Sequence, residues 1–144
     1  MNVAAMHDAV LTALDQTTVT VYDGEVGRIP GADPGDPLQT PPADNSGRVY
    51  PYALVWSTGG EPGPEQDVTR ASTGDVWRTH VNIAAGHPTW LMQAIPVVRA
   101  RLHLLEVAPG VRLTEDEVGG VITKDPDTIP PRWFLPTRWS ALTV

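Results

Sequence analysis

Acidic side chains that fall in pairs or runs are the residues of this chain whose type and spacing best suit chemistry. Asp33 and Asp36 form one pair, Asp125 and Asp127 another, and residues 115–117 read Glu-Asp-Glu. Paired carboxylates act as general acid and base only in a cleft that separates their pKa values. These groups lie among prolines and glycines on predicted loop tips, so we interpret them as solvated charges and expect no catalytic residues.

Histidine and cysteine could ligate a metal ion, but their placement predicts no metal site. The four histidines, at positions 7, 80, 87 and 103, are scattered, and no two are four residues apart. The chain contains no cysteine, which excludes thiolate sites and disulfides. The acidic pairs also lack the alternating oxygen ligands and the closing glutamate of a calcium loop. We expect neither a metal ion nor another cofactor.

The common catalytic motifs are missing as well. The sequence has no phosphate-binding loop, no dinucleotide-binding glycine motif, no zinc-protease motif and no serine-hydrolase elbow. We therefore predict a protein that is not an enzyme. A small hydrolase or carbohydrate-binding module, built from the acidic pairs and some of the five tryptophans, is the alternative from another functional class.

Length and charge limit the function classes further. At 144 residues the chain fits one domain, residues 1–144, and it has neither a membrane-spanning apolar run nor a signal sequence. The formal net charge of −7 and the pI near 4.8 argue against a protein that wraps nucleic-acid phosphates. We expect a chain made in the cytoplasm, without a membrane partner.

The stretch from Asp75 to Val107 has the densest apolar pattern and predicts the core. Apolar and polar residues alternate through a strand that ends near Ile83, which indicates one buried face, and a helix with one apolar stripe follows to cover it. The stripe consists of Leu91, Ile95, Val98, Leu102 and Leu105. Pro96 predicts a kink in this helix or, alternatively, the start of a second helix, and Pro109-Gly110 should end it.

The flanking segments complete an α+β fold. A helix over residues 2–15 precedes strands at Thr17–Tyr22 and Val49–Ser57. A closing strand over Arg132–Val144 is expected to bend or bulge at Pro136. The order α-β-β-β-α-β-β predicts a mostly antiparallel sheet, with the N-terminal helix and the long amphipathic helix packed on it.

Residues 24–48 form the longest expected loop. Between Glu25 and Gly47 the sequence has five prolines and a single basic residue, Arg28. This composition favours no regular element. We interpret the segment as a flexible surface loop; the alternative is an arm that orders only against a neighbouring subunit.

The order of several sequence pieces resembles a known protein family. VYDGEV follows the first helix, YPYALVW follows the Gly/Pro/Asp-rich loop, DVWRTHVNIAAG and VVRARL come next, and PPRWFLPTRW closes the chain. In this layout, over nearly its whole length, the chain resembles the tail terminator (tail completion or minor tail) proteins of long-tailed phages that infect actinobacteria. None of the pieces is a catalytic signature, so the resemblance depends on their order.

The resemblance implies a virion protein, assembled in the host cytoplasm, that forms a hexameric ring on the head-proximal end of the tail tube. Such a ring stops tube growth, contacts the tail tube protein and the head–tail connector or stopper protein, and lets genomic DNA pass through its lumen without sequence-specific binding. A connector or stopper ring of the neck is the nearest alternative. The candidate interaction residues are Arg78, His80, Arg99, Glu115, Asp116, Glu117 and Arg132.

Overall fold

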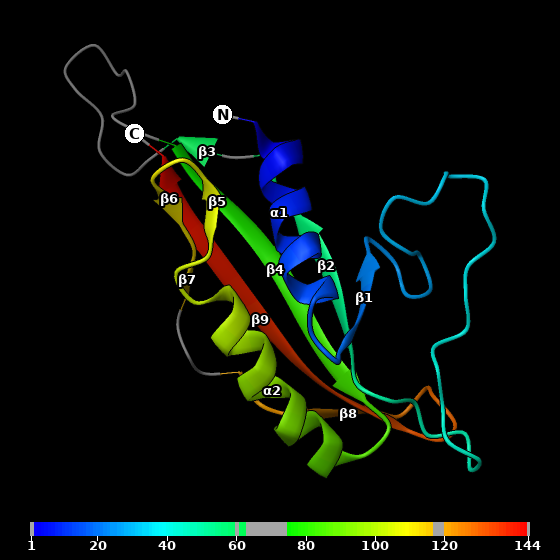
Figure 1. The fold of residues 1–144 in the computed structure, drawn as a ribbon. Helices are drawn as coiled ribbons and strands as arrows, with labels where there is room; N and C mark the ends of the chain where they lie inside the picture. The colour runs from blue at the N-terminus through cyan, green and yellow to red at the C-terminus, as the bar shows by residue number, and fades with distance from the viewer. Residues whose placement is uncertain (1, 60, 63–74, 117–119, 144) are drawn as a thin grey trace.

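A computed structural model of the chain describes residues 2–59, 61–62, 75–116 and 120–143. Figure 1 shows two helices lying on one face of a long, twisted sheet, which makes the fold α+β as the sequence predicts. The elements in chain order are α1 (Val3–Asp15), β1 (Thr20–Asp23), β2 (Tyr52–Ser57), β3 (Glu61–Pro62), β4 (Asp75–Ala85), α2 (Pro88–Leu102), β5 (Glu106–Ala108), β6 (Val111–Arg112), β7 (Thr114–Glu115), β8 (Thr123–Asp125) and β9 (Arg132–Thr143).

The main sheet has the strand order β1-β2-β4-β9-β7, with β3 also paired to β4 and β8 also paired to β9. Strands β1 and β2 pair in parallel, and the other pairs in this sheet are antiparallel. The longest ladder joins β4 to β9 from Asp75 opposite Thr143 to Ala85 opposite Trp133. Strands of two or three residues, such as β3 and β7, are too short for sequence periodicity to reveal.

The core lies between the helices and the sheet. From β4, Trp77, Val81 and Ile83 are fully buried, as the alternating pattern predicts. The predicted stripe of α2 faces them, with Leu91, Ile95, Val98 and Leu102 buried. Helix α1 adds Met6, Val10, Leu11 and Leu14 to the same cluster. Apolar area removed from water stabilises this layer by roughly 25 cal/mol per Å².

Helix α2 differs from its predicted extent at one end. It continues through Pro96, so no second helix begins there, but it ends at Leu102 rather than near Pro109. Leu104 adopts a left-handed backbone conformation with φ of 58°, and its N–H donates to the carbonyl of Leu113. The prediction that Pro109-Gly110 ends the helix was therefore wrong, because these residues instead form the turn of the β5–β6 hairpin.

Of the bend or bulge predicted at Pro136, the bulge was also wrong. Pro136 lies opposite Asn82 in the middle of β9, and the β4–β9 register does not shift there. The outer side of β9 pairs with β8 only up to Phe134 and with β7 only from Trp139. Pro136 therefore falls in the gap between these two short partners, where a strand needs no further N–H donor.

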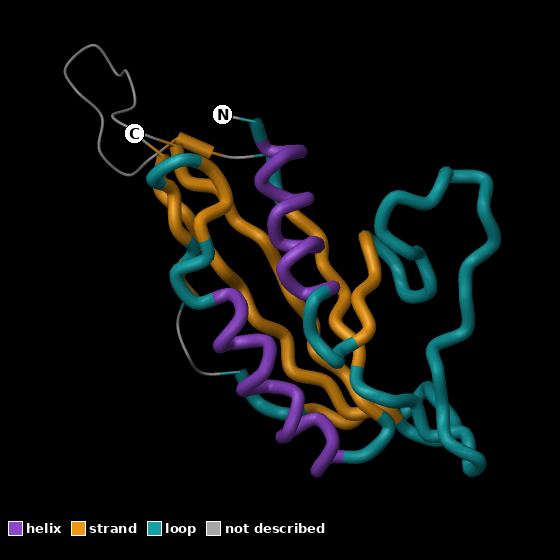
Figure 2. Tube along the Cα trace, in the orientation of Figure 1, coloured by secondary structure: helices purple, strands orange, loops and turns teal. Residues whose placement is uncertain are grey.

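The face of the sheet opposite the helices is only partly covered. At one end Tyr22, Val49, Tyr52 and Ala84 form a second, smaller buried cluster. Beyond this cluster, the side chains of β2, β4 and β9 on this face are exposed or half-buried. Residues 24–48, which we call the arm, leave the sheet at β1 and extend away from the body before returning to β2 (Figures 1 and 2).

Candidate functional site: the open face of the sheet

The strand register places a mixed aromatic and charged surface on the face without helices. Rows of cross-strand neighbours join Leu54, Asn82 and Pro136, then Trp56, His80 and Arg138. We call the surface formed by these residues, together with Arg78 and Ser140, the open face. Its centre is the row from Trp56 to Arg138.

An exposed tryptophan is the main apolar feature of the open face. The Trp56 side chain is 43% exposed and stacks on His80, with ring centroids 3.8 Å apart and planes within 4° of parallel. Directly opposed side chains on neighbouring strands interact most strongly. The stack therefore holds the two rings face to face across neighbouring strands, with Trp56 partly exposed.

Asp116 organises the positive charge on this face. Its Oδ2 lies 2.8 Å from Nε of Arg138 and 3.6 Å from Nε of Arg78, and its Oδ1 accepts a hydrogen bond of 2.5 Å from the Ser140 hydroxyl. The Asp116 backbone N–H also donates to the Arg138 carbonyl. Two arginines thus approach one carboxylate.

His80 is held in its neutral form by this environment. Burial lowers its pKa below the ordinary value of 6.5, the neighbouring Arg138 guanidinium lowers it further, and Arg78 adds to that effect. The Asp116 carboxylate acts in the opposite direction but does not reverse the shift. A neutral imidazole is the form that stacks on Trp56 without carrying an unpaired charge between two arginines.

The remaining predicted interaction residues lie elsewhere. Arg99 on α2 makes a bidentate pair with Glu115 of β7, with nitrogen–oxygen distances of 3.0 to 3.2 Å. Arg132 donates to the Tyr52 hydroxyl at 3.2 Å, and its guanidinium lies 5.7 Å from the Tyr52 ring centre. Glu117 lies outside the described residues. The structure thus brings together Arg78, His80 and Asp116, and pairs Arg99 with Glu115 inside the subunit.

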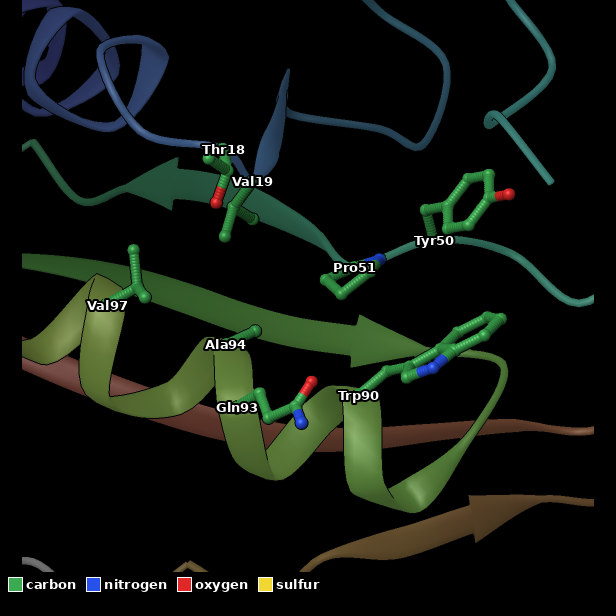
Figure 3. A pocket seen from close by; sticks show the side chains of 8 residues that line it. All are labelled: Thr18, Val19, Tyr50, Pro51, Trp90, Gln93, Ala94 and Val97. Atoms are coloured by element: carbon green, nitrogen blue, oxygen red, sulfur yellow. The ribbon is translucent and has the colours of Figure 1, made fainter. Parts of the chain in front are cut away.

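A second surface feature is a groove between α2 and the start of β2. Its volume is about 430 Å³, and its walls come from three separate segments, as Figure 3 shows. Tyr50 and Trp90 stack at its mouth with centroids 5.4 Å apart. The lining residues are Thr18, Val19, Tyr50, Pro51, Trp90, Gln93, Ala94 and Val97. No single stretch of sequence predicted this groove.

No protein-family model matches the chain, and a search of curated proteins finds no match. Across the described ranges, no three histidine or acidic side chains are grouped so that they could hold a metal ion. In the same ranges, no helix is long and apolar enough to cross a membrane. Function is therefore inferred from the fold and its surfaces.

A polar cluster beneath α1 was missed at the sequence level. His7 on α1 lies between Asp23, at the end of β1, and Ser57, at the end of β2. The three positions are separated by 16 and 34 residues and belong to no local motif. Only the parallel pairing of β1 with β2 brings Asp23 beside Val55 and so places both polar groups under the helix.

Proposed function

We propose that this protein is a structural subunit of a phage tail. In this role it is a tail terminator that assembles as a hexameric ring, as the family resemblance implies, on the head-proximal end of the tail tube. The observation that carries the proposal is the arm, because it extends from the sheet edge as a preformed contact element. The α+β layout broadly matches the order of helices and strands predicted from the sequence. In a ring of identical subunits such a protruding element can contact a different surface of the neighbouring copy.

The arm holds its shape through one arginine. Arg28 pairs with Glu25 at 3.0 Å, and its NH1 group donates to the carbonyl oxygens of Asp33 and Asp36 at 3.3 and 2.6 Å. The Gln39 N–H then closes the loop onto the carbonyl of Gly27 at 2.8 Å. These bonds reduce the entropy that the arm would lose on binding, which favours association.

The two edges of the sheet differ, as a ring requires. One edge is β1 with the arm beside it, and the other consists of the short strands β7 and β8 along β9. A cyclic ring joins unlike surfaces of neighbouring copies head to tail, whereas an isologous dimer joins like surfaces. The fold therefore offers each subunit two different sides for its two neighbours.

In this role the ring stops tube growth and offers its other side to the head–tail connector or stopper protein. The net charge of −7 suits a lumen through which DNA passes without being held, because like charges repel the phosphates. A connector or stopper ring of the neck, the second candidate, has the same requirements for subunit contacts. Locating the labelled subunit in density of the assembled virion distinguishes the two positions.

The experiment that tests the ring is mass measurement by light scattering at high protein concentration, with negative-stain imaging in the presence of tail tubes. Replacing residues 29–40 by a Gly-Ser linker should abolish the ring and leave the circular dichroism spectrum unchanged. Met92→Ser, at a residue of α2 that is 56% exposed and lies outside the arm and the edge strands, is the matched control and should leave the ring intact. A monomer under all of these conditions contradicts the proposal.

A further inference from the structure

The polar cluster beneath α1 has the geometry of an acid–base–nucleophile arrangement. The Ser57 hydroxyl oxygen lies 2.6 Å from Nδ1 of His7, and Nε2 of the same ring lies 2.7 Å from Oδ1 of Asp23. Both distances are within the range expected between a nucleophile, its base and the carboxylate that orients the base. Such constellations are recognised by geometry and not by their order in the sequence.

The hydrogen-bond directions in this cluster are determined by the carboxylate. An ionised Asp23 only accepts, so Nε2 of His7 carries the proton that it donates to Asp23. In the neutral imidazole Nδ1 then has a free lone pair, which can accept the Ser57 hydroxyl proton. The imidazole is thereby held in the tautomer that can accept the Ser57 proton.

Thr79 supports this orientation from the buried side. Its hydroxyl oxygen lies 2.9 Å from the Ser57 hydroxyl oxygen, and Thr79 itself is fully buried. The Thr79 hydroxyl also donates to the Trp56 carbonyl at 3.5 Å, so either hydroxyl can be the donor in its contact with Ser57. The Ser57 hydroxyl is thus fixed between two partners in place of rotating freely.

The side chains of the cluster are partly exposed to solvent. The side chains of His7 and Asp23 are 19% and 36% exposed, and Ser57 is half-buried at the end of β2. By contrast, Ser140 on the open face is bonded to a carboxylate, Asp116, but to no imidazole. Ser140 is therefore a hydrogen-bonded serine without a histidine base, and its reactivity can be compared with that of Ser57.

We propose that Ser57 is an activated nucleophile that hydrolyses small, activated esters, with His7 as its general base and Asp23 as a positioning residue. This departs from the expectation of a protein without catalysis and does not depend on the proposed ring. The substrate class follows from the chemistry of the cluster, because an ester with a good leaving group needs only a nucleophile and a general base to react.

The reaction balances with water as the only co-reactant. The Ser57 oxygen attacks the ester carbonyl carbon and its proton moves to Nδ1 of His7; the carbon–oxygen bond to the alcohol then breaks, and the departing oxygen takes that proton. A water molecule next attacks the acyl-Ser57 carbonyl and gives one proton to Nδ1. The Ser57 oxygen leaves and recovers that proton, so ester and water yield acid and alcohol.

The test is labelling of the intact chain with a fluorophosphonate probe, with the modified peptide identified by mass spectrometry, together with hydrolysis of 4-nitrophenyl acetate. The adduct should lie on Ser57, and the Ser57→Ala variant should lose it while Ser140→Ala keeps it. His7→Gln should slow both reactions by about 100-fold or more, the scale of general-base catalysis. No labelling of the unaltered chain, or labelling that persists in Ser57→Ala, overturns the proposal.

The positioning role of Asp23 has its own readout. Asp23→Asn should reduce the labelling rate by about tenfold or more and change its pH profile, because the amide can hold the wrong tautomer, and Asp23→Glu should restore part of the rate. The circular dichroism spectrum of each variant shows that it is folded. If His7→Gln unfolds the chain, the pH profile of labelling in the unaltered protein tests the role of His7. A labelling rate that stays constant with pH, and so needs no deprotonated group, contradicts the proposal.

Discussion

At the scale of single residues, the open face combines groups whose properties depend on their neighbours. Trp56 is exposed because it lies on the sheet face without helices, and His80 stacks on it in the neutral form. The two flanking arginines, Arg78 and Arg138, make protonation of the imidazole unfavourable, while Asp116 compensates only in part. The charge state of one histidine is thus coupled to the arrangement of the surface around it.

This coupling predicts a pH dependence of stability. Because the pKa of His80 is lowered in the folded chain, the unfolded chain binds more protons below about pH 6.5, and the free energy of unfolding should fall as the pH decreases through that range. His80→Gln should reduce this slope. Urea denaturation followed by tryptophan fluorescence at pH 5.5 and 7.5 measures the pH dependence of the free energy of unfolding. Equal slopes for the unaltered protein and His80→Gln would contradict the lowered pKa of His80.

At the scale of elements, α2 stabilises the fold through one buried apolar stripe and through one ion pair. The stripe was predictable because its spacing follows the helical period. The ion pair was not, because Glu115 reaches Arg99 only after the chain has formed the β5–β6 hairpin and entered β7. The two contributions can be separated by substitutions on the same helix.

Leu102→Ala should lower the free energy of unfolding by about 2–5 kcal/mol, since this side chain is fully buried and its truncation leaves a cavity. Met92→Ala, on the same helix but 56% exposed, is the control and should cost less than about 0.5 kcal/mol. Chemical denaturation of both variants provides the measurement. Similar losses for the two would place the core on a different face of α2.

Arg99→Ala should destabilise the fold by about 1–3 kcal/mol, because it leaves the Glu115 carboxylate, which is only 13% exposed, without its bidentate partner. Arg112→Ala removes a pair of 3.6 Å to Glu106 in which both side chains are more than half exposed, and should cost at most about 1 kcal/mol. Thermal or urea denaturation of the two variants compares their losses of stability. A larger loss in Arg112→Ala would refute this ranking.

At the scale of the whole molecule, the helices and the open face divide the subunit into a packed side and an exposed side. The arm extends beyond the β1 edge and is organised internally by Arg28 (Figure 2). Folding of the body and presentation of the arm are therefore nearly independent. Under the proposed function, a change in the arm should affect assembly without affecting the core.

Arg28→Ala should weaken ring formation while changing the free energy of unfolding by less than about 1 kcal/mol, because its bonds lie within an exposed loop. Arg48→Ala, at the other end of the arm, removes none of these bonds and is the control. Light scattering over a range of concentrations, combined with denaturation, separates the two effects. Loss of stability with an unchanged ring would mean that Arg28 supports the body instead.

The sequence by itself determined both helices, the long strands and the buried faces of β4 and α2, because each follows from a periodicity within a few neighbouring residues. It also named Arg78, His80 and Asp116 as candidate interaction residues, but it did not predict that Arg78 and Asp116 meet. Only the tertiary structure decided where α2 ends, since the pairing of Leu104 with Leu113 competes with helix continuation. It also decided that His7, Asp23 and Ser57 meet, because strand register and helix packing join positions that no local pattern connects.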